Sequence, residues 1–276
     1  MVRPRKSFAQ HWLRCQQTLD RIILSANLTD RDIVLEIGPG TGNLTARLLP
    51  LVQALVIVEI DRQLCTKLRQ KFTDPKLHLI EGDILDTDLA NLPLAPHKVV
   101  ANIPYNITGL ILEKLLGSIA KPCTQWQSIV LLVQKEIADR LTAKPHDKHK
   151  AYGALSVRAQ YLAHCEYICE VPPRAFYPAP QVTSAVVRLT PRSLPVTADD
   201  PDRLDQLVRM GFANRRKMLH NNLSTVIDKA NLGAILSAMN LSPHARAEEL
   251  SLDHWIHLAN QLPSPLGTGV REKFPI

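Results

Sequence analysis

The sequence predicts an open, mostly parallel α/β sheet followed by a small all-helical domain. From residue 32 to residue 143, apolar runs typical of buried strands alternate with segments whose apolar residues recur at helical spacing. This repeated strand–helix order is typical of parallel sheets with right-handed crossovers. After residue 201 only helical spacing remains, so we expect the sheet to be complete before that point.

The strands are predicted from short apolar runs that end in glycine or polar residues. The parallel strands are expected at residues 32–37, 54–60, 77–81, 97–101 and 128–133. Two closing strands, with an antiparallel one among them, are expected near residues 167–171 and 184–189, on either side of a proline-rich turn at 172–180. Helical spacing predicts helices at residues 16–26, 43–49, 62–72, 108–120, 134–143 and 152–163.

The chain is predicted to divide near residue 190. Residues 1–190 would form the sheet domain, beginning with an arm at residues 1–13 that is either a frayed tail or a segment that folds over a ligand. Residues 191–201 have the composition of a linker. Residues 202–262 are expected to form the helical domain, with helices at 202–213, 215–227, 232–239 and 252–261, and residues 263–276 a loose tail.

Composition bounds the class of protein. A chain of 276 residues with 45% hydrophobic residues is long enough for one core and a smaller second domain. The net charge of +7 favours a polyanionic partner such as nucleic acid, although a solvated basic surface produces the same balance. The N-terminus shows no secretory signal and no apolar run is long enough to cross a bilayer. We therefore expect a cytoplasmic protein with no membrane partner, and we expect it to be a monomer.

The cysteines and histidines do not form a pattern that binds metal. The five cysteines are scattered and none belongs to a Cys-x-x-Cys pair, which argues against a disulfide framework and against a zinc knuckle. The ten histidines show no ligand spacing either. We expect a reducing compartment and no metal site.

A glycine-rich segment, Gly38-Pro39-Gly40-Thr41-Gly42, lies between the first predicted parallel strand and a helix. Its glycines let the backbone approach a ligand, and the helix N-terminus offers unpaired N–H groups, so the segment suits a nucleotide-like cofactor. The G-x-G-x-G spacing departs from the dinucleotide fingerprint, which counts against a dehydrogenase.

Acidic residues end the next two strands. Glu59 is the preferred ligand for a ribose diol, while Asp61 is expected to cap the following helix. Asp83 is placed to accept from an adenine amino group, or alternatively to cap a turn.

The segment Asn102-Ile103-Pro104-Tyr105 follows directly on a predicted strand. If the Asn102 amide oxygen and a carbonyl of Ile103 or Pro104 both accept from a planar amine, they hold it in line with a methyl donor and stabilise the positive charge that develops on nitrogen. Together with the glycine loop, the segment predicts methyl transfer from S-adenosylmethionine to a nitrogen, without a dedicated general base. The fold would then be a Rossmann-like class I methyltransferase sheet.

Two aromatic side chains are candidates for holding the target base, which must be extruded or single-stranded to reach such a site. Tyr105 would stack on the base, the alternative being a core aromatic. Phe176, in the proline-rich turn, would form the opposite wall, the alternative being loop packing.

A basic cluster lies on the predicted helix 215–227. Its cations either position an RNA helix through phosphate contacts or form a solvated basic face. The candidate RNA-binding residues are Arg215, Arg216, Lys217, Asn221 and Asn222.

Taken together, these motifs resemble the ribosomal RNA adenine N6,N6-dimethyltransferases, specifically the bacterial kasugamycin-sensitivity family that modifies small-subunit (16S) RNA. The resemblance runs from about residue 5 to the last predicted helix. The segments that carry it are residues 10–13, 36–45, 59, 81–83, 102–105, 134–140, 176–184 and 215–223.

The resemblance implies dimethylation of two adjacent adenines in the loop that closes the 3′-terminal hairpin of 16S RNA, within an immature small subunit. It implies a catalytic group of Asn102, Pro104, Tyr105 and Phe176. The contacts to S-adenosylmethionine would come from Gln10, His11, Leu13, Gly38, Gly40, Glu59, Ile60, Asp83, Ile84 and Asn102. The chain departs from the family pattern at His11, where the arm usually has asparagine, and at His220, where arginine is common.

Two other functions are compatible with parts of the pattern. A methyltransferase acting on DNA adenine or on a glutamine amide would share the Asn102–Tyr105 chemistry but would not need a basic helical domain. A ribosome-assembly factor in which methyl transfer is dispensable would not need the intact glycine loop and Asn102 segment.

Overall fold

The computed structural model describes residues 10–147, 151–194 and 196–262. Within them, contacts divide the chain into two compact units. Residues up to 116, 123–138 and 164–191 form the first unit, and residues 117–122, 139–163 and those from 192 onward form the second. Residues 148–150 and the predicted tail at 263–276 lie outside the described residues.

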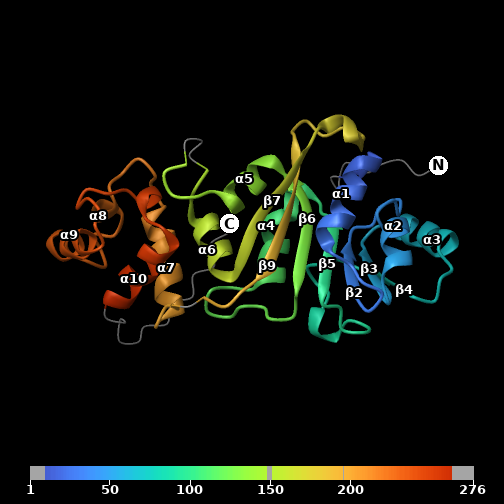
Figure 1. Cartoon of the computed structure of the whole chain (residues 1–276), viewed down its shortest axis with the longest axis horizontal. Coiled ribbons are helices and arrows are strands. Elements are labelled where there is room, and N and C mark those ends of the chain that lie inside the picture. Colours follow the sequence, from blue (N-terminus) through green and yellow to red (C-terminus); the bar gives the residue numbers. More distant parts are fainter. Residues whose placement is uncertain (1–9, 148–150, 195, 263–276) are drawn as a thin grey trace. The chain divides into compact units, whose positions relative to one another are not determined.

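The first unit is built on a seven-stranded sheet with the order β4-β3-β2-β5-β6-β9-β7 (Figure 1). Neighbouring strands from β4 to β6 are parallel, and β9 runs antiparallel to β6. This confirms the mostly parallel sheet with an antiparallel closing strand. The strands are β2 (Ile33–Ile37), β3 (Ala54–Glu59), β4 (Leu77–Glu81), β5 (Lys98–Asn102), β6 (Ser128–Gln134), β7 (Ala163–Val171) and β9 (Ser184–Pro191).

The strand order reverses between β2 and β5. From β2 the chain continues outward to β3 and β4, and then returns to place β5 on the other side of β2. Loops at the carboxyl ends of β2 and β5 therefore diverge and leave a crevice, which is where open α/β sheets bind ligands.

The middle strands are apolar because helices cover both faces of the sheet. Val34, Leu55, Ile57 and Val130 are buried with Leu19 of the first helix in one core. The helices that accompany the sheet are α1 (Gln16–Ala26), α2 (Thr45–Leu48), α3 (Arg62–Lys71), α4 (Thr108–Leu116) and α5 (Lys135–Thr142) (Figure 1).

Two of these helices are shorter than predicted. α2 ends at Leu48 and gives way to a 3-10 turn, Leu49–Leu51, which contains Pro50. α4 ends at Leu116 because Gly117 adopts a left-handed conformation (φ +76°), which stops an α-helix.

The second unit is helical. Its helices are α6 (Ala154–Leu162), α7 (Pro201–Gly211), α8 (Leu219–Asn222), α9 (Lys229–Ala238) and α10 (Leu252–Gln261). They pack around Trp255, which is fully buried. The predicted boundary at residue 190 had placed α6 with the sheet. The structure places it in the second unit, where Arg158 Nε lies 2.9 Å from an Asp205 carboxylate oxygen of α7.

The helix predicted at residues 215–227 is wrong. Only α8, Leu219–Asn222, is helical there, and the residues just before it form turns. The side chain of Asn222 stabilises the observed turns, because its amide nitrogen donates to the carbonyls of Gly211 (2.6 Å) and Asn214 (3.0 Å). These bonds tie the end of α8 back to the C-terminus of α7 and to the turn that follows it, and the N–H of Lys217 completes that turn by donating to the Asn214 carbonyl (3.1 Å).

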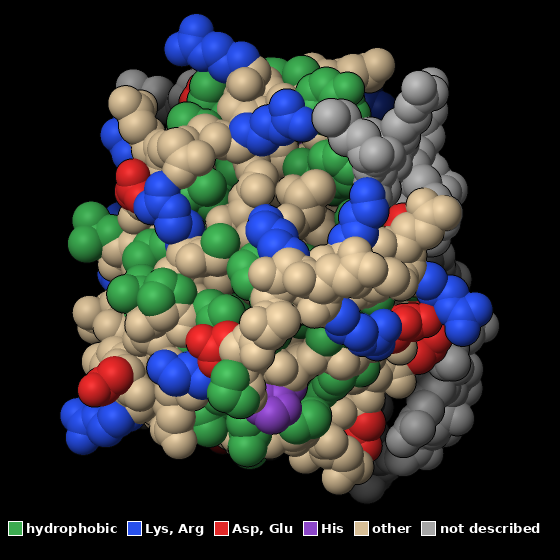
Figure 2. All heavy atoms as spheres, turned by 90° about the vertical axis from the view of Figure 1, so that its right-hand side faces the viewer, with side chains coloured by type: hydrophobic (Ala, Val, Ile, Leu, Met, Phe, Trp, Pro, Cys, Tyr) green, Lys and Arg blue, Asp and Glu red, His purple; other side chains and the backbone are tan. Residues whose placement is uncertain are grey.

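The face of the first unit that Figure 2 shows carries charges of both signs. Figure 2 views the unit from the side of α2 and α3 and shows separate Lys and Arg side chains interspersed with Asp and Glu. The positive net charge therefore does not by itself locate a binding face. Within the described residues, no helix is both long enough and apolar enough to span a bilayer.

Candidate cofactor and substrate site

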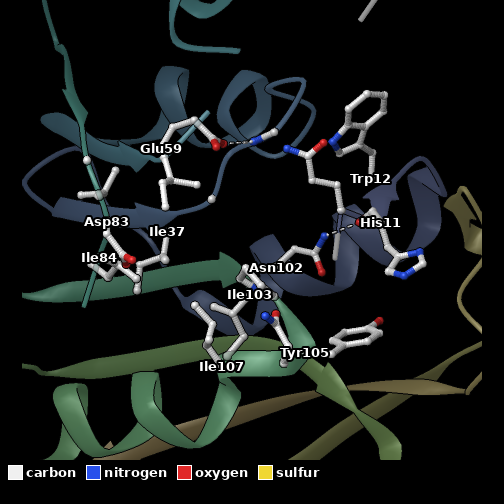
Figure 3. Close-up of a pocket in the computed structure, with 18 residues that line it drawn as sticks. His11, Trp12, Ile37, Glu59, Asp83, Ile84, Asn102, Ile103, Tyr105 and Ile107 are labelled. Carbon is white, nitrogen blue, oxygen red and sulfur yellow. Dashed lines mark hydrogen bonds between the residues drawn. The ribbon is translucent and has the colours of Figure 1, made fainter. Parts of the chain in front are cut away.

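A cavity of about 260 Å³ opens at the carboxyl ends of β2, β3 and β5 (Figure 3). It brings together the glycine loop, the two acidic strand ends, the Asn102 segment and the N-terminal arm, which are far apart in the sequence. Its lining comprises Gln10, His11, Trp12, Ile37, Gly38, Gly40, Val58, Glu59, Ile60, Gly82, Asp83, Ile84 and residues 102–107.

The conformation of the glycine loop requires glycine at two positions. Gly38 and Gly40 have left-handed φ angles of +63° and +59°, which favour glycine. A Cβ at Gly40 would lie 2.8 Å from Cδ1 of Trp12, so a larger residue there would collide with the arm. The Gly38 N–H donates to the Val58 carbonyl (2.9 Å), which fixes the loop to β3.

Glu59 links the glycine loop to the end of β3. Its carboxylate accepts from the N–H of Gly40 (3.1 Å) and from the N–H of Asp61 (2.9 Å). The side chain is buried, and this burial raises the pKa of Glu59. Asp61 caps α3 by accepting from the N–H of Gln63 (2.9 Å), which confirms the prediction that Asp61 is the cap of this helix.

Asp83 caps a turn and also lines the cavity. One carboxylate oxygen accepts from the N–H of Leu85 (2.8 Å) and so caps the turn after β4. The residue also lines the cavity, next to buried Ile84 (Figure 3). Because the turn uses one oxygen, the other remains as an acceptor.

Asn102 is the last residue of β5 and points into the cavity (Figure 3). Its amide nitrogen donates to the backbone carbonyl of His11 (3.0 Å). This bond fixes the orientation of the side chain, and within the described residues nothing donates to the amide oxygen. The oxygen is therefore free to accept from a ligand.

Tyr105 begins a 3-10 turn, Tyr105–Ile107, directly after Pro104. Its hydroxyl shares a hydrogen bond of 2.5 Å with Ser184 Oγ at the start of β9. Burial raises the pKa of Tyr105. The ring faces the cavity, so the alternative of a purely structural core aromatic does not describe it (Figure 3).

The arm forms a short strand that the sequence did not predict. β1 (Trp12–Leu13) pairs antiparallel with β8 (Phe176–Tyr177) in the proline-rich turn. Asn43, just after the glycine loop, donates through its amide nitrogen to the Leu13 carbonyl (2.8 Å). The described part of the arm thus folds over the cavity, and residues 1–9 lie outside the described residues.

Two predicted site residues do not reach the cavity. Phe176 and Leu13 face each other across the β1–β8 pair, and both are buried in the hydrophobic core. Side chains alternate along a strand, so their neighbours Tyr177 and Trp12 point the other way. Tyr177 is half exposed and Trp12 lines the cavity. The prediction that Phe176 forms the opposite wall is corrected by this register. The side chain of Leu13 lies in the core as well, so the predicted cofactor contact of Leu13 is left to its backbone.

Sequence reasoning missed several of the residues that line the cavity. Trp12 could have been suspected only from its place in the arm, because its contact with Gly40 depends on the tertiary fold. Ile37 and Val58 were assigned to buried strands, and their cavity-facing position follows from lying at the carboxyl ends of β2 and β3.

The candidate RNA-binding residues of the second unit differ in what they are free to bind. The guanidinium of Arg215 donates to the Tyr152 carbonyl, and the amide nitrogen of Asn222 is used in a turn. Arg216, Lys217 and Asn221 are exposed. No group of three His, Cys, Asp or Glu side chains that could hold a metal occurs among the described residues.

The strand order and a cavity at the carboxyl ends of its middle strands place the chain among the class I S-adenosylmethionine-dependent methyltransferases. The chain matches the model of the ribosomal RNA adenine dimethylase family over residues 1–263, and it belongs to that family.

Relatives support this membership along nearly the whole chain. A protein of Rippkaea orientalis named ribosomal RNA small subunit methyltransferase A is 59% identical and covers 95% of this chain and 98% of its own. A protein of Trichormus variabilis with the same name is 55% identical and covers 95% of this chain and 99% of its own.

Two solved structures are similar at 27% identity. A dimethyladenosine transferase from Plasmodium falciparum has a TM-score of 0.73 and covers 90% of this chain and 96% of its own. The 23S rRNA methyltransferase ErmE has a TM-score of 0.74 and covers 91% of this chain and 99% of its own.

The cavity fits the cofactor of this class. Gly38 and Gly40 present backbone without side chains to the cavity, and the buried Glu59 carboxylate accepts from the Gly40 N–H. Asp83 offers an acceptor elsewhere in the lining, and apolar side chains such as Ile84 form much of the remaining wall.

Proposed function

We propose that the protein transfers methyl groups from S-adenosylmethionine to N6 of two adjacent adenines in the 3′-terminal hairpin loop of 16S rRNA. The substrate is the immature small ribosomal subunit, and the reaction is part of small-subunit biogenesis. The observation that supports this most is that the Asn102–Tyr105 segment and the glycine loop line one cavity.

The residues proposed to contact S-adenosylmethionine bind the cofactor and orient it. Glu59 is suited to a ribose diol because its carboxylate is held rigidly by two backbone N–H groups. The free oxygen of Asp83 is suited to an exocyclic amino group, with Ile60 and Ile84 as apolar walls. Gly38 and Gly40 let the backbone approach, and Gln10 covers the cavity from the arm. The bound cofactor supplies an electrophilic methyl group on a sulfonium.

The acceptor amine is held by oxygen atoms at the end of β5. The Asn102 amide oxygen is one acceptor. The Ile103 carbonyl is favoured as the other, because the Pro104 carbonyl already accepts from Thr108 Oγ1 (3.1 Å). Two acceptors fix both amine hydrogens, which aims the nitrogen lone pair and stabilises its developing positive charge. Such positioning contributes several kcal/mol, about 7–11 kcal/mol at its upper limit.

The choice of the small-subunit RNA is supported by the relatives rather than by the fold. The dimethyladenosine transferase and the 23S rRNA enzyme resemble the chain equally well in structure, with TM-scores of 0.73 and 0.74. Proteins more than half identical to this chain carry the small-subunit name. We also propose that the protein acts as a monomer in the cytoplasm. Size-exclusion chromatography with light scattering would check the oligomeric state.

The direct test is to incubate the protein with labelled S-adenosylmethionine and small subunits that lack the modification, and then to map the labelled nucleotides. We expect label on N6 of the two adjacent adenines. Label on large-subunit RNA, on DNA or on protein, with none on small subunits, would contradict the proposal.

A further inference from the structure

The turn after β4 carries Asp83 and has strand support on one side. β4 is an edge strand of the sheet, with β3 as its neighbour. The turn begins at Gly82, whose N–H donates to the Glu59 carbonyl at the end of β3 (2.9 Å). On the other flank the sheet offers no strand within the described residues. A second attachment of the turn must therefore come from another kind of contact.

Hydrogen bonds within the turn set its shape. The Asp83 carbonyl accepts from the N–H groups of Asp86 (3.1 Å) and Thr87 (3.0 Å), and from Thr87 Oγ1 (2.7 Å). The N–H of Leu85 donates to the Asp83 carboxylate (2.8 Å). All of these partners lie within residues 83–87, so the bonds make the turn compact without attaching it to the rest of the first unit.

Lys114 of α4 attaches this turn to a second element. Its Nζ donates to the Leu85 carbonyl (2.7 Å), although the two residues are 29 positions apart in the chain. The Lys114 side chain is half-buried, and a hydrogen bond from a charged donor is stronger than one between neutral groups. The turn is therefore held by β3 through Gly82 and by α4 through Leu85.

The helix α4 is a firm support for this contact. It follows directly on the 3-10 turn Tyr105–Ile107, which lines the cavity. Its residues Ile111 and Leu115 are fully buried, so packing in the core fixes the helix in place. Lys114 thus links the turn of Asp83 to a rigid element that borders the same cavity.

We propose that Lys114 is a positioning residue that makes the cofactor site selective for adenine. By holding the turn through Leu85, it keeps the second carboxylate oxygen of Asp83 where the exocyclic amino group of the cofactor can donate to it. A carboxylate only accepts hydrogen bonds, so a purine with a carbonyl in place of that amino group leaves the acceptor unpaired. The inference rests on the proposed function, because it deepens the role proposed there for Asp83.

The test compares two ligands by calorimetric titration. One is S-adenosylhomocysteine and the other is S-inosylhomocysteine, in which a carbonyl replaces the amino group of adenine, so the ratio of their affinities measures the selectivity. Lys114→Met keeps an apolar stem but loses the donor, and Lys114→Arg keeps a cationic donor. Asp83→Asn gives the ratio expected when the selecting carboxylate is lost. Lys121→Met, at an exposed lysine that follows α4, is the control for the loss of a positive charge.

We expect the wild type to bind S-adenosylhomocysteine more tightly than S-inosylhomocysteine by at least about tenfold, the order of effect of a hydrogen bond to a charged group. Lys114→Met should bind S-adenosylhomocysteine more weakly by on the order of fivefold, because a displaced carboxylate makes a poorer hydrogen bond. Its affinity for S-inosylhomocysteine should stay at the wild-type value, which also shows that the variant is folded. Lys114→Arg should keep most of the wild-type ratio, and Lys121→Met all of it.

A ratio in Lys114→Met equal to that of the wild type would overturn the inference. Equal losses of affinity for the two ligands would overturn it as well, because they would show a general loosening of the first unit. So would a wild-type ratio retained in Asp83→Asn. If Lys114→Met does not fold, Lys114→Gln is judged by the same criteria. The titration contains no RNA, so its outcome is independent of the methylation of small subunits, which tests the proposed function itself.

Discussion

At the scale of single residues, the buried acid Glu36 has the most unusual environment. It lies in β2, is almost fully buried, and accepts a hydrogen bond from Thr45 Oγ1 (2.7 Å) at the start of α2. Burial raises the pKa of Glu36 to about 8, and the charge of Glu59 adds to this rise. A neutral carboxyl at pH 7 thus connects β2 with α2, on either side of the glycine loop.

This environment predicts a pH dependence of stability. Between about pH 4.5 and 8, the folded state keeps a proton on Glu36 that the unfolded state releases. The contribution of Glu36 to stability is therefore fully present below pH 4.5 and is lost as the pH rises through about 8, with a slope of up to about 1.4 kcal/mol per pH unit.

We expect Glu36→Gln to remove this slope. The free energy of unfolding of the variant, relative to that of the wild type, should then rise by a few kcal/mol between pH 5 and pH 8. Urea unfolding of both proteins at pH 5, 6, 7 and 8 measures the difference, and all other titrating groups cancel in it. Parallel stability curves for the two proteins would show that Glu36 does not titrate in this range.

At the scale of elements, the glycine loop and the arm depend on each other. Trp12 of β1 lies against Gly40, and the amide of Asn43 holds the Leu13 carbonyl. A side chain at residue 40 would disturb both the left-handed backbone and the packing of the arm.

Gly40→Ala is expected to lower the free energy of unfolding by about 1–3 kcal/mol and to weaken cofactor binding. Gly82→Ala is the matched control. It also lines the cavity, but its Cβ would meet nothing closer than Thr87 Oγ1 at 3.9 Å. Thermal unfolding and titration with S-adenosylhomocysteine measure both effects. Equal losses in the two variants would contradict the specific role of the Gly40–Trp12 contact.

In the turn that replaces the first part of the predicted helix 215–227, the three cations have different surroundings. Arg216 and Lys217 are exposed, while Arg215 is tied to the Tyr152 carbonyl. Replacing Arg216 and Lys217 together by alanine should weaken small-subunit binding and reduce the salt slope by roughly one per lost phosphate contact.

Arg215→Ala should instead lower the thermal stability of the protein, because it removes a link within the second unit. Lys229→Ala, another exposed cation of that unit, is the control for a general effect of charge. Affinities measured at several salt concentrations distinguish the variants. A salt slope unchanged by the Arg216 and Lys217 substitutions would show that these residues belong to an ordinary solvated surface and do not contact phosphates.

The parts of the fold that could be predicted are those determined locally. Strand β4 matches its predicted range, and Asp61 caps α3, because a short apolar run and a capping side chain act within a few residues. Phe176 was assigned wrongly because its direction depends on the register of β8 against β1. The helix around Arg215 was assigned wrongly because helical spacing alone does not reveal the turns after α7, which a side-chain bond from Asn222 to the Gly211 carbonyl stabilises.

At the scale of the whole molecule, family membership and the cavity point to the same chemistry. The chain belongs to the ribosomal RNA adenine dimethylase family, and its cavity combines a cofactor cradle with the free amide oxygen of Asn102. The positive net charge suits a polyanionic substrate, although the face of the first unit in Figure 2 mixes cations with acidic side chains. We therefore expect recognition of the proposed RNA substrate to depend on particular contacts more than on total charge.

The central claim is that the Asn102 amide oxygen holds the amine during methyl transfer. The most direct measurement is the single-turnover rate of methyl transfer to unmodified small subunits by the wild type, Asn102→Ala and Asn102→Asp, alongside S-adenosylhomocysteine affinity. Asn102→Asp keeps an acceptor oxygen but loses the donor to the His11 carbonyl.

We predict that Asn102→Ala lowers the rate by at least about a hundredfold, the usual minimum for losing a transition-state donor or acceptor, while cofactor affinity is largely retained. Asn102→Asp should fall between the two. A rate for Asn102→Ala equal to that of the wild type would contradict the account.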